Sequence, residues 1–156
     1  MVILGIDPGT VRIGYGVIKH DKNPQFVECG LLKINTADNN SRIVEAARHF
    51  KKLLTIYKPD LVAIEKLFFV NNQKTGMAVA QLRGALVFLT SEAGIPIAEF
   101  APTEVKSAVS GSGSADKKAM SKMVRLLLKL DKIPGPDDVS DALAICLTAA
   151  FNSRSM

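Results

Sequence analysis

The chain has 156 residues, of which 47% are hydrophobic and 22% are charged, and its formal net charge is +5. This length predicts one domain over residues 1–156 with a single buried core. No apolar run approaches the ~20 residues of a membrane helix, and the N-terminus lacks the basic start and cleavage site of a signal peptide. We therefore expect a cytoplasmic protein with no membrane partner.

The first third of the chain predicts three β-strands. Residues 2–7 form an apolar run that ends in the turn Asp7-Pro8-Gly9-Thr10. Residues 11–19 alternate between large apolar side chains and glycine, and residues 25–34 follow a second turn. Connections this short join antiparallel neighbours, so the three segments predict a meander.

Beyond residue 40, helical periodicity alternates with short apolar runs. The expected elements are, in chain order, a helix at about 41–57, a strand at 61–65, a helix at 73–93, a strand at 96–100, and helices at 102–109, 115–130 and 137–151. Ser114 is placed to cap the helix at 115–130. Because crossover helices add parallel strands to a meander, this order predicts an α/β domain with a mixed sheet. Cys29 and Cys146 lie in apolar contexts and are expected to be reduced core residues.

Basic residues are concentrated in two segments. Residues 41–58 carry five Lys or Arg against one Glu, and residues 101–132 carry seven against three acids. Lysine and arginine commonly do no more than solvate helix faces. Combined with a cluster of acidic residues that recruits a metal, however, basic helices favour a phosphodiester substrate.

Acidic residues follow both of the most apolar predicted strands. Asp7 ends the first strand, and Glu65 follows Leu61-Val62-Ala63-Ile64. A carboxylate at the end of a buried strand costs desolvation free energy unless a partner compensates its charge. Asp7 could instead hydrogen-bond the backbone of its own turn. Nothing structural requires an acid at position 65, although Glu65 could simply face solvent or pair with Lys66.

A further acidic pair opens the last predicted helix. Asp138 and Asp141 are three residues apart and share a helix face, while the neighbouring Asp137 is interpreted as a helix cap. Capping does not require Asp141. Together with Asp7 and Glu65, the pair predicts a site for Mg²⁺, which prefers oxygen ligands. Two such ions can activate water and stabilise the leaving 3′ oxygen of a phosphodiester.

Five motifs in order resemble the RuvC family of Holliday junction resolvases. They are Gly5-Ile-Asp7-Pro-Gly9, Gly14-Tyr-Gly16-Val, Ala63-Ile-Glu65, Gly111-Ser-Gly113-Ser-Ala115-Asp-Lys117 and Asp138-Val-Ser-Asp141-Ala-Leu-Ala. The resemblance covers nearly the whole chain. It implies an RNase H-like fold with a mixed five-stranded sheet, working as a homodimer. It also implies Mg²⁺- or Mn²⁺-dependent nicking of two opposed strands at a four-way DNA junction, in recombination and repair. A branch-migration motor of the RuvA and RuvB type is the implied partner.

The resemblance also implies residue roles. The catalytic and metal-binding carboxylates, two ions per site, match Asp7, Glu65, Asp138 and Asp141. The DNA-binding residues match Phe68, Lys106 and Lys117, to which we add Lys118 because helix N-termini attract phosphate. An aromatic ring at Phe68 is expected to stack on an unpaired base, while Phe69 either stacks on DNA as well or packs in the core.

Two positions depart from the family pattern, Ala119 where a glutamine is usual and Lys66 where we expect an amide. A stripe of small residues, Gly76, Ala80 and Gly84, allows the close approach of either the chain's own sheet or a second subunit.

Two alternative functions also have to be considered. One is a related nuclease acting on RNA or another branched DNA, and the other is a catalytically silent junction-binding protein, against which the four intact acids argue. An actin-like nucleotide-binding module would need a second lobe, for which 156 residues leave no room.

Overall fold

A five-stranded mixed sheet forms the centre of the molecule. The computed structural model describes residues 1–9, 11–67 and 73–153. The strands are β1 (Val2–Pro8), β2 (Arg12–His20), β3 (Pro24–Lys33), β4 (Leu61–Glu65) and β5 (Ile97–Phe100). They lie in the order β3-β2-β1-β4-β5, with β1, β2 and β3 antiparallel and β1, β4 and β5 mutually parallel. The predicted meander and mixed sheet are confirmed.

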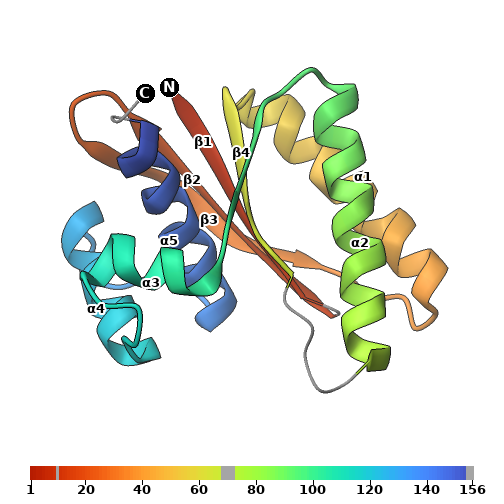
Figure 1. Ribbon diagram of the computed structural model, residues 1–156. Helices are drawn as coiled ribbons and strands as arrows, with labels where there is room; N and C mark the ends of the chain where they lie inside the picture. The colour runs from red at the N-terminus through yellow and green to blue at the C-terminus, as the bar shows by residue number, and fades with distance from the viewer. Residues whose placement is uncertain (10, 68–72, 154–156) are drawn as a thin grey trace.

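Helices cover both faces of this sheet (Figure 1). The helices are α1 (Asn39–Tyr57), α2 (Gln73–Glu92), α3 (Pro102–Ser110), α4 (Lys117–Leu128) and α5 (Asp137–Asn152). In Figure 1, α1 and α2 lie on one side of the sheet, and α3, α4 and α5 lie on the other. Two hydrophobic clusters correspond to these two interfaces, one containing Phe50 of α1 and the other containing Leu143 of α5. The chain is therefore a three-layer α/β structure.

The central helix α5 packs unusually close to the sheet. Eleven residues of α5 between Val139 and Ala150 are buried, so most sides of this helix are in contact with the rest of the protein. Glycines on the facing strands make this approach possible. A Cβ atom on Gly5 would collide with the backbone carbonyl oxygen of Ala142, and one on Gly16 would lie 2.7 Å from Leu143 Cδ2. The strand glycines therefore set how near the N-terminal half of α5 lies to β1 and β2.

Two predicted caps are corrected by the structure. Helix α4 begins after Asp116, whose carboxylate accepts a hydrogen bond from the Ala119 backbone N–H at 2.7 Å, so Ser114 is not its cap. An acidic cap is favoured there because its negative charge also interacts favourably with the positive, N-terminal end of the helix dipole. Asp137 is the first residue within α5 and makes no capping hydrogen bond; its carboxylate instead pairs with Lys117 at 3.6 Å.

The two cysteines are buried and unpaired, as predicted. Burial raises the pKa of both thiols, and Cys146 Sγ donates to the Gly16 carbonyl oxygen at 3.2 Å. Within the part of the chain that the structure describes, no helix combines the length and apolar character needed to cross a membrane.

Candidate active site

Asp7 and Glu65 lie at the same edge of the sheet. Strands β1 and β4 are parallel neighbours in which Ile6 is opposite Ile64, so the next residue of each strand is one of these two acids. The surrounding isoleucines are fully buried or nearly so, whereas both carboxyl groups are at the rim of the core. Strand pairing alone therefore accounts for half of the acidic cluster.

The other half comes from the first turn of α5. Gly14 of β2 is opposite Asp7 in the antiparallel register, and a Cβ atom on Gly14 would collide with the backbone carbonyl oxygen of Asp138. The N-terminus of α5 thus lies directly against β2 beside Asp7. Asp138 and Asp141 are three residues apart, so both face this edge of the sheet. We call Asp7, Glu65, Asp138 and Asp141 the acidic cluster.

Burial and like charges act together on Asp7. The pKa of its carboxyl group is raised from 3.8 to about 7, mainly by burial and in addition by the charges of Asp141, Glu65 and Asp138. The charge of Lys117 opposes this shift. A carboxyl group with a pKa near neutrality, surrounded by three other acids, is typical of a functional site that needs a compensating cation.

The two partly buried neighbours are perturbed in the same direction. Burial and the charge of Asp141 raise the pKa of Glu65, while Lys106 lowers it. Burial also raises the pKa of Asp141, where Lys117 is the strongest opposing influence. The two lysines therefore offset only part of the free-energy cost of holding these carboxylates together.

Two cations form ion pairs at the acidic cluster. Lys117 Nζ lies 3.9 Å from Asp141 Oδ2 as well as 3.6 Å from Asp137 Oδ2, and Arg12 Nε lies 3.5 Å from Asp138 Oδ2. The sequence analysis did not identify Arg12. Its position directly after the β1–β2 turn was the available signal, because a tight hairpin returns the chain to the strand end that carries Asp7.

A cavity of about 370 Å³ lies beside these groups. Its walls combine polar groups with the core of the α3, α4 and α5 layer. The lining residues are Glu65, Pro102, Val105, Lys106, Ala115, Asp116, Lys117, Met120, Asp141, Ala144 and Ile145. The cavity thus brings two lysines together with three carboxylates, which suits a substrate that carries negative charge and is attacked next to a metal.

The acidic cluster fits a divalent ion in its donor chemistry. All four groups offer hard oxygen ligands, and a cation would relieve the repulsion that raises the pKa of Asp7. Within residues 1–9, 11–67 and 73–153, no three His, Cys, Asp or Glu side chains are grouped closely enough to hold a metal ion. Asp138 and Asp141 pair with Arg12 and Lys117 instead. Metal binding would therefore compete with these two ion pairs.

Arg83 of α2 supports the strand end that carries Glu65. Its Nε donates to the Glu65 carbonyl oxygen at 3.1 Å, and its Nη2 lies 2.7 Å from Glu99 Oε1 of β5. One guanidinium group thus connects β4, β5 and α2 immediately behind the site. The half-buried Arg83 is a positioning residue that the sequence analysis also missed, since its partners are distant in sequence.

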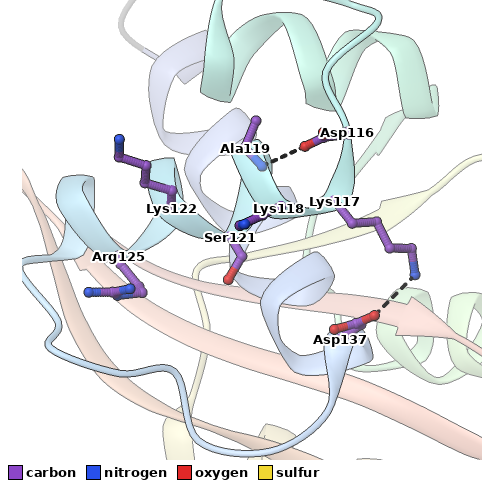
Figure 2. A pocket seen from close by; sticks show the side chains of 8 residues that line it. All are labelled: Asp116, Lys117, Lys118, Ala119, Ser121, Lys122, Arg125 and Asp137. Atoms are coloured by element: carbon purple, nitrogen blue, oxygen red, sulfur yellow. Dashed lines mark hydrogen bonds and ion pairs between the residues drawn. The ribbon is translucent and has the colours of Figure 1, made fainter.

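The remaining predicted residues lie at different distances from the cluster. Lys66 forms its ion pair with Glu104, at 3.7 Å, and not with a carboxylate of the acidic cluster. Lys118 is exposed on α4 and lines a neighbouring groove together with Ala119 (Figure 2). Phe68, predicted to stack on DNA, and Phe69, for which stacking on DNA and packing in the core were both open, lie outside the described residues.

Comparison with known proteins identifies clear relatives. The sequence model of the family described as "Crossover junction endodeoxyribonuclease RuvC" matches residues 3–149. A crossover junction endodeoxyribonuclease RuvC from Synechococcus sp. (strain RCC307) is 42% identical over 156 residues, covering 97% of this chain and 99% of the relative. The structure of T. thermophilus RuvC in complex with a Holliday junction substrate matches with a TM-score of 0.93 and 32% identity, over 99% of this chain and 96% of that one.

A more distant match supports the fold alone. The yeast mitochondrial Holliday junction resolvase Ydc2 aligns with a TM-score of 0.71 at 17% identity, covering 97% of this chain. The agreement over such low identity reflects the shared arrangement of a mixed five-stranded sheet flanked by helices, which is the RNase H-like architecture predicted from sequence.

Proposed function

The chain belongs to the RuvC family of crossover junction endodeoxyribonucleases, and from this premise we propose that the acidic cluster is where it hydrolyses DNA. It is an endodeoxyribonuclease that resolves Holliday junctions in recombination and repair. The observation that carries the proposed site is the burial of Asp7 among Glu65, Asp138 and Asp141, which raises its pKa to about 7. A fold does not keep such a repulsive arrangement for stability.

Membership of this family implies dependence on divalent metal ions. We propose that Asp7, Glu65, Asp138 and Asp141 hold two Mg²⁺ ions, with Mn²⁺ as a substitute. When bound, such ions supply Lewis-acid activation of the attacking water and stabilisation of the leaving 3′ oxygen. Asp7 loses its proton on loading, because only the carboxylate form is a metal ligand.

The lysines beside the acidic cluster bind the substrate in this proposal. Lys106 and Lys117 line the cavity with Glu65 and Asp141, so their charges are placed to hold the non-bridging oxygens of the scissile phosphodiester. Lys117 then changes partners from Asp137 and Asp141 to phosphate. Arg12 pairs with Asp138 and thereby orients that carboxylate.

The wild-type protein should nick a labelled mobile four-way junction symmetrically when Mg²⁺ is added. A linear duplex and an RNA–DNA hybrid of the same sequence are the controls, and they should remain intact. Cleavage of the hybrid at a comparable rate would favour the alternative of an RNA-directed nuclease. Inclusion of a branch-migration motor of the RuvA and RuvB type, the partner we propose, should redistribute the nicks along the mobile core.

We propose that two chains pair through α2, so that one site faces each of two opposed strands. Gly84 lies on the exposed face of this helix, and apart from the helix's own neighbouring atoms no described part of the chain comes within 4 Å of the position of its missing Cβ, so the described sheet does not occupy this face. Met77 and Phe88 lie nearby along α2 and are 66% and 62% exposed. Two large apolar side chains on either side of a small residue are suited to helix–helix packing.

Substitution Gly84→Glu should convert the dimer into a monomer, because it would bury a charge at the point of closest helix approach. Sedimentation velocity at micromolar concentration measures this directly. Val44→Glu on α1 is the matched control, since Val44 is 56% exposed on another helix. The pairing proposal is wrong if both variants sediment as the wild type does. It is also wrong if the wild type is monomeric at all concentrations tested.

For Phe68, we propose stacking on an unpaired base at the junction centre. Phe68→Ala should lower the cleavage rate of the four-way junction by roughly tenfold, as the loss of one stacked base predicts. Affinity for linear duplex, measured by fluorescence anisotropy, should change little. Equal losses in junction cleavage and duplex affinity would instead assign this ring to the core.

A further inference from the structure

A basic surface lies beside the acidic cluster and not within it. A groove of about 760 Å³ runs along the N-terminal half of α4 (Figure 2). Its lining residues are Asp116, Lys117, Lys118, Ala119, Ser121, Lys122, Arg125 and Asp137. Four cations and two acids give the groove an excess of positive charge. We call it the α4 groove.

Both acids in the α4 groove are already engaged. Asp116 accepts the hydrogen bond from Ala119 that caps α4, and Asp137 pairs with Lys117. Among the described residues, no ion pair involves Lys118, Lys122 or Arg125. Figure 2 shows Lys122 and Arg125 extending from α4 on the side away from the Lys117–Asp137 pair. Three cations on one groove thus remain available to a ligand outside the chain.

The spacing of these cations matches a nucleic acid strand. Lys118, Lys122 and Arg125 are four and three residues apart, so they lie along one face of the helix. At 1.5 Å per residue, the distance along the axis from Lys118 to Arg125 is about 10 Å. Phosphates of one DNA strand repeat about every 3.4 Å along the duplex axis. The row of cations therefore spans about three successive phosphates.

Lys117 connects this groove to the acidic cluster. Its side chain lines both the α4 groove and the cavity that contains Glu65 and Asp141. A strand whose scissile phosphate lies at that cavity can therefore continue past Lys117 on to α4 without leaving positive surface. Ala119, in the same groove, offers no polar side-chain group, and beyond it the charged side chains that line the groove on α4 are Lys122 and Arg125.

We propose that Lys122 and Arg125 form a second phosphate-binding site, which holds the backbone of the junction arm that leaves the cleavage point. This inference rests on the proposed function and adds to it the part of the substrate that α4 contacts. The site acts on phosphate and not on bases, because both side chains are mobile cations on an exposed helix face. It strengthens binding without selecting sequence.

The test is the double variant Lys122→Gln/Arg125→Gln, assayed on the full-length protein with a labelled four-way junction. Without divalent metal, its junction affinity should fall by roughly tenfold. The slope of log affinity against log salt concentration should become less steep by about 2, since two phosphate contacts are lost. Shortening the junction arms until they no longer reach α4 should weaken the wild type but not the double variant.

Arg48→Gln/Lys52→Gln is the matched control, because these residues are exposed, four positions apart, and on α1 across the sheet. It should keep wild-type affinity and salt dependence. If the α4 variant and this control behave alike while the wild type cleaves the junction, the arm-binding inference is wrong and the proposed function stands. If the wild type does not cleave the junction at all, the proposed function itself fails.

Discussion

Asp7→Asn is expected to lower junction cleavage by about a thousandfold, the magnitude typical of removing one essential charged group at a phosphoryl centre. The side-chain volume is nearly unchanged, so the cause is the loss of a carboxylate from the acidic cluster. Binding to the uncleaved junction, measured without divalent metal, should stay within roughly threefold of wild type because the phosphate-binding lysines are intact. Cleavage that survives the substitution would place the catalytic centre elsewhere.

The same variant should be more stable than the wild type in metal-free buffer. Asp7 binds its proton more tightly in the folded chain, with a pKa of about 7, than in the unfolded chain, with a pKa of 3.8. The wild type therefore loses stability as pH rises from about 4 to about 7, whereas Asp7→Asn does not lose this contribution. At pH 8, the free energy of unfolding of the variant should exceed that of the wild type by roughly 2 kcal/mol or more.

Urea unfolding in EDTA across this pH range measures the difference. The gain in stability should be small near pH 4, grow up to about pH 7, and stay constant above it. Addition of Mg²⁺ should raise the wild-type melting temperature more than that of the variant, since only the wild type keeps all four carboxylate ligands. A stability difference that does not depend on pH would contradict the charge repulsion inferred for Asp7.

Gly14→Ala is expected to have the second largest effect. A methyl group at this position would collide with the backbone carbonyl oxygen of Asp138, so the N-terminus of α5 would have to move away from β2. Overpacking of this kind costs about 1–3 kcal/mol of stability. Because Asp138 and Asp141 move with α5, cleavage should fall much further than the loss of folded protein accounts for.

Ile13→Ala provides the matched control for this loss. Ile13 is fully buried, adjacent in sequence, and packed on the opposite face of the sheet against the α1 and α2 layer. Its truncation should cost about 2–5 kcal/mol, at least as much as Gly14→Ala. Under conditions where both variants are folded by circular dichroism, Ile13→Ala should cleave junctions near the wild-type rate. Equal activity of the two variants would mean that α5 is not displaced.

These two residues illustrate how much local sequence reveals. Asp7 was identified as a candidate ligand because it follows a strictly apolar strand, and that strand is β1 as expected. Gly14 was recognised only as part of an alternating strand and a family motif. Its physical role, the accommodation of α5, depends on Asp138, 124 positions later in the chain. Local patterns cannot encode such a contact.

Capping shows the same limit on a smaller scale. The sequence predicts Ser114 as the cap of α4, because serine is a favoured N-cap residue, but aspartate is favoured equally. The structure selects Asp116, because α4 begins at Lys117 and the Asp116 carboxylate reaches the Ala119 N–H. Asp137 lies inside the first turn of α5, after Pro136 at the N-cap position, and its carboxylate pairs with Lys117 of a different helix.

The sequence by itself determined the order of strands and helices and the family, and it predicted the four acidic residues as candidate metal ligands, because these follow from hydrophobic periodicity, turn residues and ordered motifs within short segments. Only the tertiary structure decided that Arg12 pairs with Asp138, that Arg83 supports Glu65, and that Lys117 joins the acidic cluster to the α4 groove. It also decided the raised pKa of Asp7. The physical reason is that charge interactions and desolvation depend on distances between segments far apart in the chain, which packing of α5 against the strand glycines sets.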